Sequence, residues 1–88
     1  MSGAENEEYI CGAILIDGVQ VLPAIRGILT PGAFQMEAYR AIYVAGLSLL
    51  DAGEPIDPVS IKAHAKRQGV ELSNKLLSEL MEVVPSAA

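Results

Sequence analysis

Few side chains in this 88-residue sequence are suited to catalysis or metal binding. There is one cysteine, Cys11, and one histidine, His64, so disulfide and metal frameworks are excluded by count. No Ser, His and Asp residues lie in a recognisable catalytic-triad motif. No pair of carboxylates is placed in contrasting environments that would suit a general acid and a general base. Cys11 is predicted to be a small buried hydrophobe and His64 a partly exposed helix residue. We therefore expect no catalytic residue, no cofactor and no metal site.

Nucleic acid is a second possible ligand, and the basic residues of the C-terminal third are the candidates for it. They are Lys62, Lys66, Arg67 and Lys75. The rest of the chain is acidic, with eight acidic and two basic residues up to residue 57 and a net charge of −5. Because phosphate binding requires excess Lys and Arg, DNA contact is predicted to be unlikely. A helix-turn-helix-like DNA-binding domain is kept as an alternative.

Protein contact is the third possibility, and it is favoured by the large apolar content. Hydrophobic residues make up 51% of the sequence and charged residues only 19%, which leaves apolar surface for a partner or a neighbouring domain. Tyr39 and Tyr43 are four residues apart and share a helical face, and tyrosine is common in interfaces. The alternative is that both rings cover the small core. The residues predicted to make protein contacts are Glu5, Glu7, Tyr39, Tyr43 and Leu76.

These side chains must be positioned by helices, and the stretch Phe34–Asp57 contains the most apolar one. Its apolar face covers more than half of the helical circumference, which is typical of a helix surrounded by others. Gly53 and Pro55 provide a stop signal at its end. The pattern predicts a central helix over about residues 35–52.

Shorter helices are predicted on either side of the central one. Asp57 followed by Pro58 is a typical helix start, Gly69 closes that helix, and a further helix begins near Ser73. At the N-terminal end, Asp17 and Gly18 between apolar runs favour a two-residue hairpin, although Asp17 can equally cap a second helix. The helical alternative gives one all-α domain, a compact bundle of about five short helices.

No targeting or membrane segment is indicated. No uninterrupted apolar run approaches the ~18–20 residues needed to span a bilayer, and the N-terminus lacks the basic region of a signal peptide. We expect a cytoplasmic protein that does not enter a membrane.

Four motifs, in order along the chain, resemble the N-terminal domain of the bacterial and phage replicative DNA helicase DnaB family. They are EEYICGAILID, LTPGAF, YRAIYVAGLSLLDAGEPIDPVSI and ELMEVVPSAA. The GEPIDPVSI segment after the central helix is the most specific of them. The resemblance implies an all-helical fold, and so a helix rather than a hairpin at Asp17. It also implies that copies of this domain associate to form the collar of the helicase ring, and that primase or a helicase loader binds to this collar.

The sequence departs from the family pattern at several places. Tyr39 stands where the family usually has histidine, and Leu76 stands where it has an aromatic residue. The chain stops at Ala88, where the family continues into a helical hairpin and an ATPase motor, and it has no G-x-x-x-x-G-K-(S/T) loop to bind nucleotide phosphates. ATP and magnesium would belong to that absent motor domain. A second hypothesis is therefore a free-standing helical protein that binds replication proteins.

Overall fold

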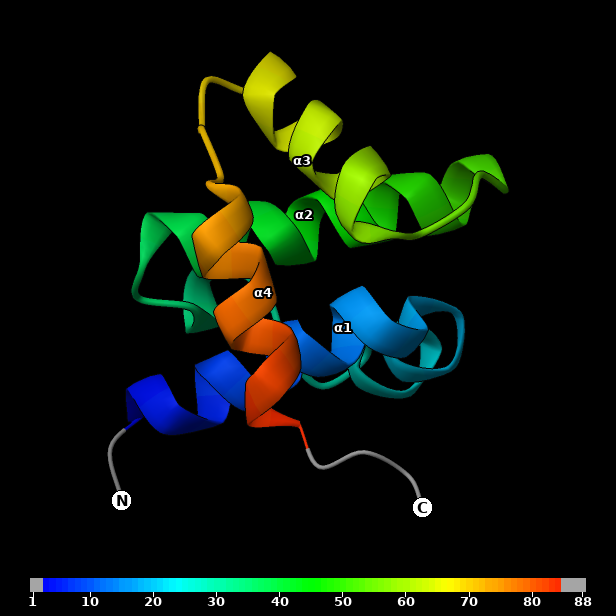
Figure 1. Cartoon of the computed structure of the whole chain (residues 1–88). Helices are drawn as coiled ribbons and strands as arrows, with labels where there is room; N and C mark the ends of the chain where they lie inside the picture. Colours follow the sequence, from blue (N-terminus) through cyan, green and yellow to red (C-terminus); the bar gives the residue numbers. More distant parts are fainter. Residues whose placement is uncertain (1–2, 85–88) are drawn as a thin grey trace.

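The computed structural model describes the backbone of residues 3–84 and the side chains of residues 6–84. The elements are α1 (Gly3–Ile25), the 3-10 turn η1 (Pro31–Ala33), α2 (Glu37–Ala52), α3 (Pro58–Arg67) and α4 (Asn74–Val83). Figure 1 shows α2 across the middle of the molecule, α3 on one side of it and α1 on the other, with α4 running from the α3 side down onto α1. The predicted all-α class and the central helix are confirmed.

The prediction of about five helices is slightly wrong, because residues 3–84 contain four α-helices. The first two predicted helices form one helix, α1, which is bent at Asp17 (φ −148°, ψ 57°). The hairpin alternative is also wrong, since these residues are helical on both sides of Asp17. A Cβ atom on Gly18 would lie 2.6 Å from Cγ2 of Ile56, so glycine beside the bend lets the α2–α3 loop pack closely.

Most of the predicted helix boundaries are confirmed by their caps. Gly53 ends α2 in the left-handed conformation (φ 69°), which an L side chain would strain. Asp57 accepts a hydrogen bond from the Ser60 backbone N–H at 2.8 Å, and Ser73 caps α4 in the same way through Leu76 N–H. Thr30 precedes η1 at the N-cap position but makes no side-chain cap bond.

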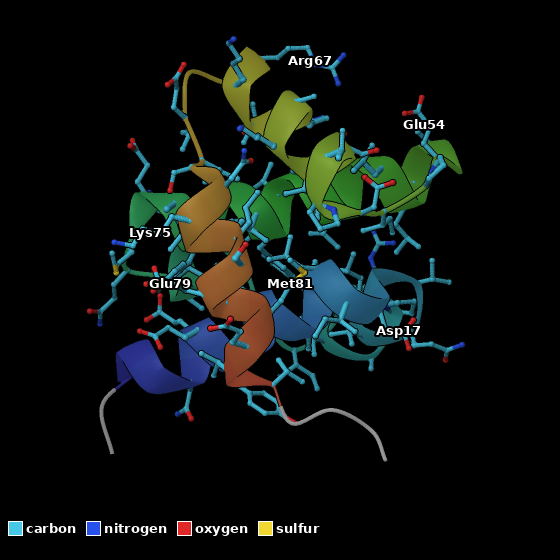
Figure 2. The ribbon with its side chains drawn as sticks, in the orientation of Figure 1. Asp17, Glu54, Arg67, Lys75, Glu79 and Met81 are labelled. Atoms are coloured by element: carbon cyan, nitrogen blue, oxygen red, sulfur yellow. The ribbon has the colours of Figure 1, made fainter. Side chains whose placement is uncertain are left out.

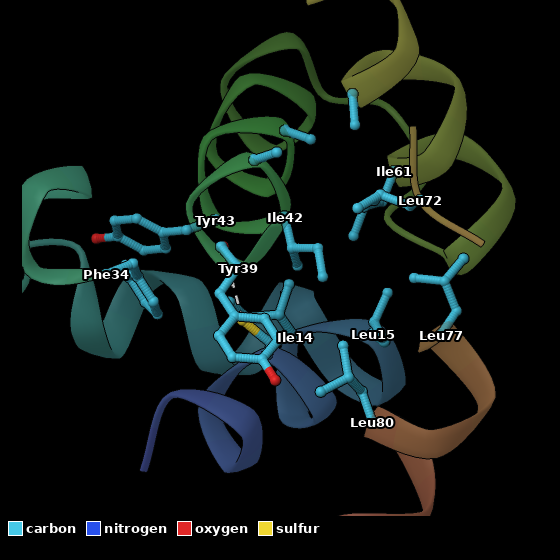
Figure 3. Close-up of a cluster of buried hydrophobic side chains, with 14 of the residues drawn as sticks. Ile14, Leu15, Phe34, Tyr39, Ile42, Tyr43, Ile61, Leu72, Leu77 and Leu80 are labelled. Carbon is cyan, nitrogen blue, oxygen red and sulfur yellow. Dashed lines mark hydrogen bonds between the residues drawn. The ribbon is translucent and has the colours of Figure 1, made fainter. Parts of the chain in front are cut away.

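The core is built from the facing sides of all four helices (Figure 3). Tyr43 and Ile42 of α2 and Ile61 of α3 are completely buried. From α4, Leu77 and Leu80 close the core over α1. At the rim, the Arg26 guanidinium donates to both carboxylate oxygens of Asp51, at 2.8 and 3.1 Å, and ties the end of α1 to the end of α2.

One part of α1, Asn6–Ile25, is long and apolar enough to span a membrane by length and composition, with a mean hydropathy of 1.4. The expectation drawn from uninterrupted apolar runs did not anticipate this. Cys11, Ile14 and Leu22 of this segment are completely buried against the other helices. Only 33% of this apolar segment is buried, and Ile16 and Val19 are more than half exposed, so the core accounts for part of the apolar content of α1.

Candidate protein-interaction surface

Tyr43, a predicted contact residue, lies in the core instead of on the surface. Its side chain is completely buried, and its ring centroid is 5.0 Å from that of Phe34, in a tilted arrangement. The hydroxyl donates a hydrogen bond to the backbone carbonyl of Leu29 at 2.6 Å, which satisfies the polar end of the ring. Burial raises the pKa of the Tyr43 hydroxyl. This ring holds the α1–α2 connection against α2.

Tyr39 is also largely buried, but it borders the surface. It lines a depression of about 260 Å³ together with Leu76 and Val83 of α4 and the carboxylate-bearing residues Glu8 and Glu79. Burial raises the pKa of the Tyr39 hydroxyl, and the charge of Glu8 and a hydrogen bond to it act in the same direction. Of the predicted contact residues, Tyr39 and Leu76 are therefore the two that the fold brings together.

The two predicted acidic contact residues differ in what the structure shows. Glu7 is buried, and its Oε1 accepts a hydrogen bond from the Gln35 backbone N–H at 2.9 Å. It thereby fixes α1 to the segment that leads into α2. Glu5 belongs to α1, but its side chain lies outside the described residues. That either residue contacts a partner stays a prediction.

His64 and Cys11 both have structural surroundings. His64 Nε2 lies 3.0 Å from Ser48 Oγ, and Nδ1 lies 2.7 Å from Gln68 Nε2. The contact with Ser48 links α3 to α2, and the donor and acceptor roles of the two ring nitrogens are set by the tautomer of His64. Cys11 is completely buried, and its thiol contacts the Tyr39 carbonyl oxygen at 3.7 Å. Between residues 6 and 84 no group of three or more His, Cys, Asp or Glu side chains is arranged to hold a metal.

The four basic residues do not form one continuous face. Lys62 and Lys66 line the same depressions between α3 and α4, and Lys62 Nζ donates to Asn74 Oδ1 at 2.9 Å. In Figure 2, Arg67 extends from the far end of α3, whereas Lys75 extends from α4 on another side of the molecule. Lys66 and Arg67 occupy the last turn of α3, where positive charge suits the helix dipole.

Sequence reasoning missed the most exposed apolar side chains. Ile28 is 79% exposed and Val59 is 78% exposed, and each is a candidate for contact with another molecule. Val59 lies in the first turn of α3, and no local sequence signal marks its exposure, because that exposure depends on α3 using another face to contact α2. Ile28 lies in the turn after α1 and had no such signal either.

Taken together, residues 3–84 form a small bundle of helices around one apolar core. The model of the DnaB-like helicase N-terminal domain family matches residues 2–88. The chain is 38% identical over 87 residues to a replicative DNA helicase DnaB from Geobacillus stearothermophilus. This alignment covers 96% of the chain but only 19% of that relative's length. No solved structure matches the chain significantly. The chain belongs to the DnaB-like helicase N-terminal domain family, as the four motifs predicted.

Proposed function

We propose that this chain is a protein-interaction and oligomerisation domain of a replicative DNA helicase. In this role it contributes to the collar of the ring and presents a surface to primase or a helicase loader. The observation that carries the proposal is the family match, which extends over residues 2–88. Collar, primase and loader contacts are properties implied by that family and are proposals for this chain. So are its cytoplasmic location and its part in DNA replication.

The surface chemistry supports this proposal independently of the family. Large apolar side chains are exposed on α1, on the α1–α2 turn and on α3, among them Tyr9, Ile28 and Val59. Such side chains scattered singly are ordinary, but on a domain this small they leave several places for a partner to bury apolar area. The depression around Tyr39 and Leu76 adds an aromatic ring edge next to carboxylates. Interface contacts of this kind combine apolar area with polar ends.

Self-association is tested by sedimentation equilibrium over a dilution series up to millimolar protein. We expect mass to increase with concentration, and Leu76→Ser to weaken that increase because it removes apolar area beside Tyr39. Val19→Ser is the matched control, since Val19 is 58% exposed on α1 and does not line this depression. A strict monomer at millimolar concentration would contradict the oligomerisation part of the proposal.

Primase contact is tested by calorimetric titration with the C-terminal domain of primase from the same organism. The chain is compared with a longer protein that adds the helical hairpin expected by the family resemblance. We expect binding to the longer protein and weaker binding to the chain itself, because two contact regions contribute more than one. If neither protein binds, the primase part of the proposal is wrong.

A further inference from the structure

A groove between α3 and α4 carries the features of a docking site. Its volume is about 370 Å³, and its lining is mainly apolar. Leu77 of α4, which is 4% exposed, contributes the floor, and Val59 and Ala63 of α3 contribute one wall. Two lysines from α3, Lys62 and Lys66, complete that side. All the residues that line this groove belong to α3 or α4.

The apolar wall is the unpartnered face of α3. This helix buries Ile61 and Ala65 against α2, and these two residues lie one turn apart. Val59 and Ala63 are also one turn apart, but on a different face, and both are exposed. Covering the Val59 side chain would remove apolar surface from water, which favours an apolar occupant.

The lysines determine the charge of that occupant. Lys62 and Lys66 are one helical turn apart, and Lys62 Nζ uses one of its donors on Asn74 Oδ1. Among the described residues the one ion pair is Arg26–Asp51, so neither lysine is neutralised by a carboxylate at salt-bridge distance. Glu71 lines the adjoining depression with both lysines but does not pair with them. A positive rim on a chain of net charge −5 is complementary to acidic side chains.

We propose that the α3–α4 groove binds an acidic amphipathic helix of a partner protein. Apolar residues of that helix, spaced three and four apart, would lie over Leu77 beside Val59, and carboxylates one turn apart would meet Lys62 and Lys66. The groove follows α3 from Pro58 to Lys66, a length of about 12 Å, and is closed on the other side only by Asn74 and Leu77 in the first turn of α4, so it fits about two turns of a helix. The proposal rests on the proposed function, since it names the chemistry of one partner of an interaction domain.

The test uses fluorescence anisotropy with a designed, fluorescein-labelled helical peptide of about four turns. The peptide carries leucines at i, i+4 and i+7 and a glutamate pair one turn apart on the flank. A matched peptide has lysines in place of the glutamates. We expect the chain to bind the glutamate peptide at least about tenfold more tightly than the lysine peptide.

Substitutions locate the binding on the groove. Val59→Ser should weaken the binding of the glutamate peptide by about tenfold, and the double change Lys62→Glu with Lys66→Glu should do the same. The double change should also create binding of the lysine peptide, a gain that misfolding cannot produce. Controls are Ile28→Ser, which alters an equally exposed apolar side chain elsewhere, and Lys75→Glu, which changes the same charge away from the groove. Both should leave peptide binding within about twofold.

Several results would overturn the proposal. They are no peptide binding at millimolar chain, equal binding of both peptides, or binding that survives both Val59→Ser and the double charge reversal. Dimerisation lost in these same variants would assign the groove to a second copy of the chain. Salt-dependent binding of duplex DNA lost with the charge reversal would assign the lysines to phosphates.

The failure of this proposal is distinguishable from failure of the proposed function. The tests of self-association and primase contact use Leu76→Ser and the longer protein. The test of the groove uses substitutions of Val59 and the two lysines. Peptide binding with no self-association and no primase contact would support the groove as a docking site and contradict the collar role. The reverse pattern would keep the collar role and remove the groove.

Discussion

The hydroxyl of Tyr43 is a polar atom carried into the core, and the fold provides for it. The ring is completely buried, and its hydroxyl donates to the Leu29 carbonyl at 2.6 Å. A phenylalanine at this position would keep the ring contacts with Phe34 but leave that carbonyl without its donor. The hydrogen bond thus explains a tyrosine in a place where the sequence pattern suggests only an apolar ring.

Tyr43→Phe is expected to lower the free energy of unfolding by about 1–2 kcal/mol, because it removes one hydrogen bond and leaves a partly buried acceptor unsatisfied. Equilibrium urea denaturation followed by far-UV circular dichroism measures the change. Tyr9→Phe is the matched control, since Tyr9 is 48% exposed, and it should change stability by less than about 0.5 kcal/mol. Equal effects of the two substitutions would show that the Leu29 contact contributes nothing.

The thiol of Cys11 makes stability depend on alkaline pH. Burial, with a smaller contribution from the charge of Glu7, raises its pKa from 9.0 to about 12. Below pH 9 the thiol is neutral in both states. Between these two pH values the unfolded chain has lost the proton and the folded chain keeps it, so the free energy of unfolding falls as pH rises, by up to about 1.4 kcal/mol per unit.

The prediction is tested by the difference in unfolding free energy between the wild type and Cys11→Ala. The hydroxyls of Tyr39 and Tyr43 also have raised pKa values, but both proteins contain them, so their effect cancels in the difference apart from the smaller contribution that Cys11 makes to the pKa of Tyr39. We expect the advantage of the wild type at pH 8 to shrink by about 1 kcal/mol at pH 10. A difference that stays constant with pH would mean that the thiol ionises equally well in both states.

At the scale of elements, two glycines set how closely the helices approach. A Cβ atom on Gly12 of α1 would lie 2.2 Å from the backbone oxygen of Leu80, so α1 and α4 touch at this point. On Gly46 of α2 it would lie 2.9 Å from Cδ1 of Leu22, which is the end of a flexible side chain. The first contact is with backbone and the second is with a movable methyl group.

Gly12→Ala should therefore be more destabilising than Gly46→Ala. Alanine favours a helix interior by about 1 kcal/mol over glycine, so each change carries a gain that the contact must exceed. We expect Gly12→Ala to lower stability by about 2 kcal/mol or more, through displacement of α4, and Gly46→Ala to have an effect of about 1 kcal/mol or less. Gly27→Ala is the control, because no atom lies within 4 Å of its added Cβ. Thermal unfolding of the three variants measures their loss of stability. A larger loss for Gly46→Ala than for Gly12→Ala would contradict the prediction.

The sequence predicts element boundaries well where one or two neighbouring residues cause them. Gly53, Asp57 and Ser73 act through their own backbone or side chain, so their caps are local and appear in the structure as expected. The bend at Asp17 was ambiguous, because the same Asp-Gly pair satisfies a hairpin turn or a bent helix, and packing of Gly18 on Ile56 favours the bend.

The candidate site was less predictable than the fold, because the exposure of a side chain depends on which residues, distant in the sequence, pack against it. Tyr39 and Tyr43 share a helical face, as their spacing predicts, but that face lies against α1 and the turn after it. Of the four basic residues, Lys62 and Lys66 line one groove, whereas Arg67 and Lys75 extend from other parts of α3 and α4. Val59 is exposed because α3 uses another face to contact α2. These facts follow from the arrangement of helices and not from any local signal.

For the whole molecule, the last helix decides whether the core is closed. Leu77 and Leu80 of α4 are buried over α1, at the opposite end of the chain, so without α4 the helix α1 loses one of its two main packing partners, α4 and α2. A chain of 88 residues has a total stability of about 4–13 kcal/mol. Leu80→Ala removes a buried side chain at a cost of about 2–5 kcal/mol, which is a large part of that range.

We therefore expect the chain to unfold in one two-state transition and Leu80→Ala to shift the whole transition to lower denaturant without splitting it. The sequence has no tryptophan and three tyrosines, two of them buried, so the near-ultraviolet tyrosine signal reports the packing of α2. Far-UV circular dichroism reports the helices, and the two signals should coincide in the wild type and in the variant. Val83→Ala, on an α4 side chain that is 42% exposed, should shift the midpoint little. If helical signal persists after the tyrosine signal is lost, the helices form independently of the core, and the role assigned to α4 is wrong.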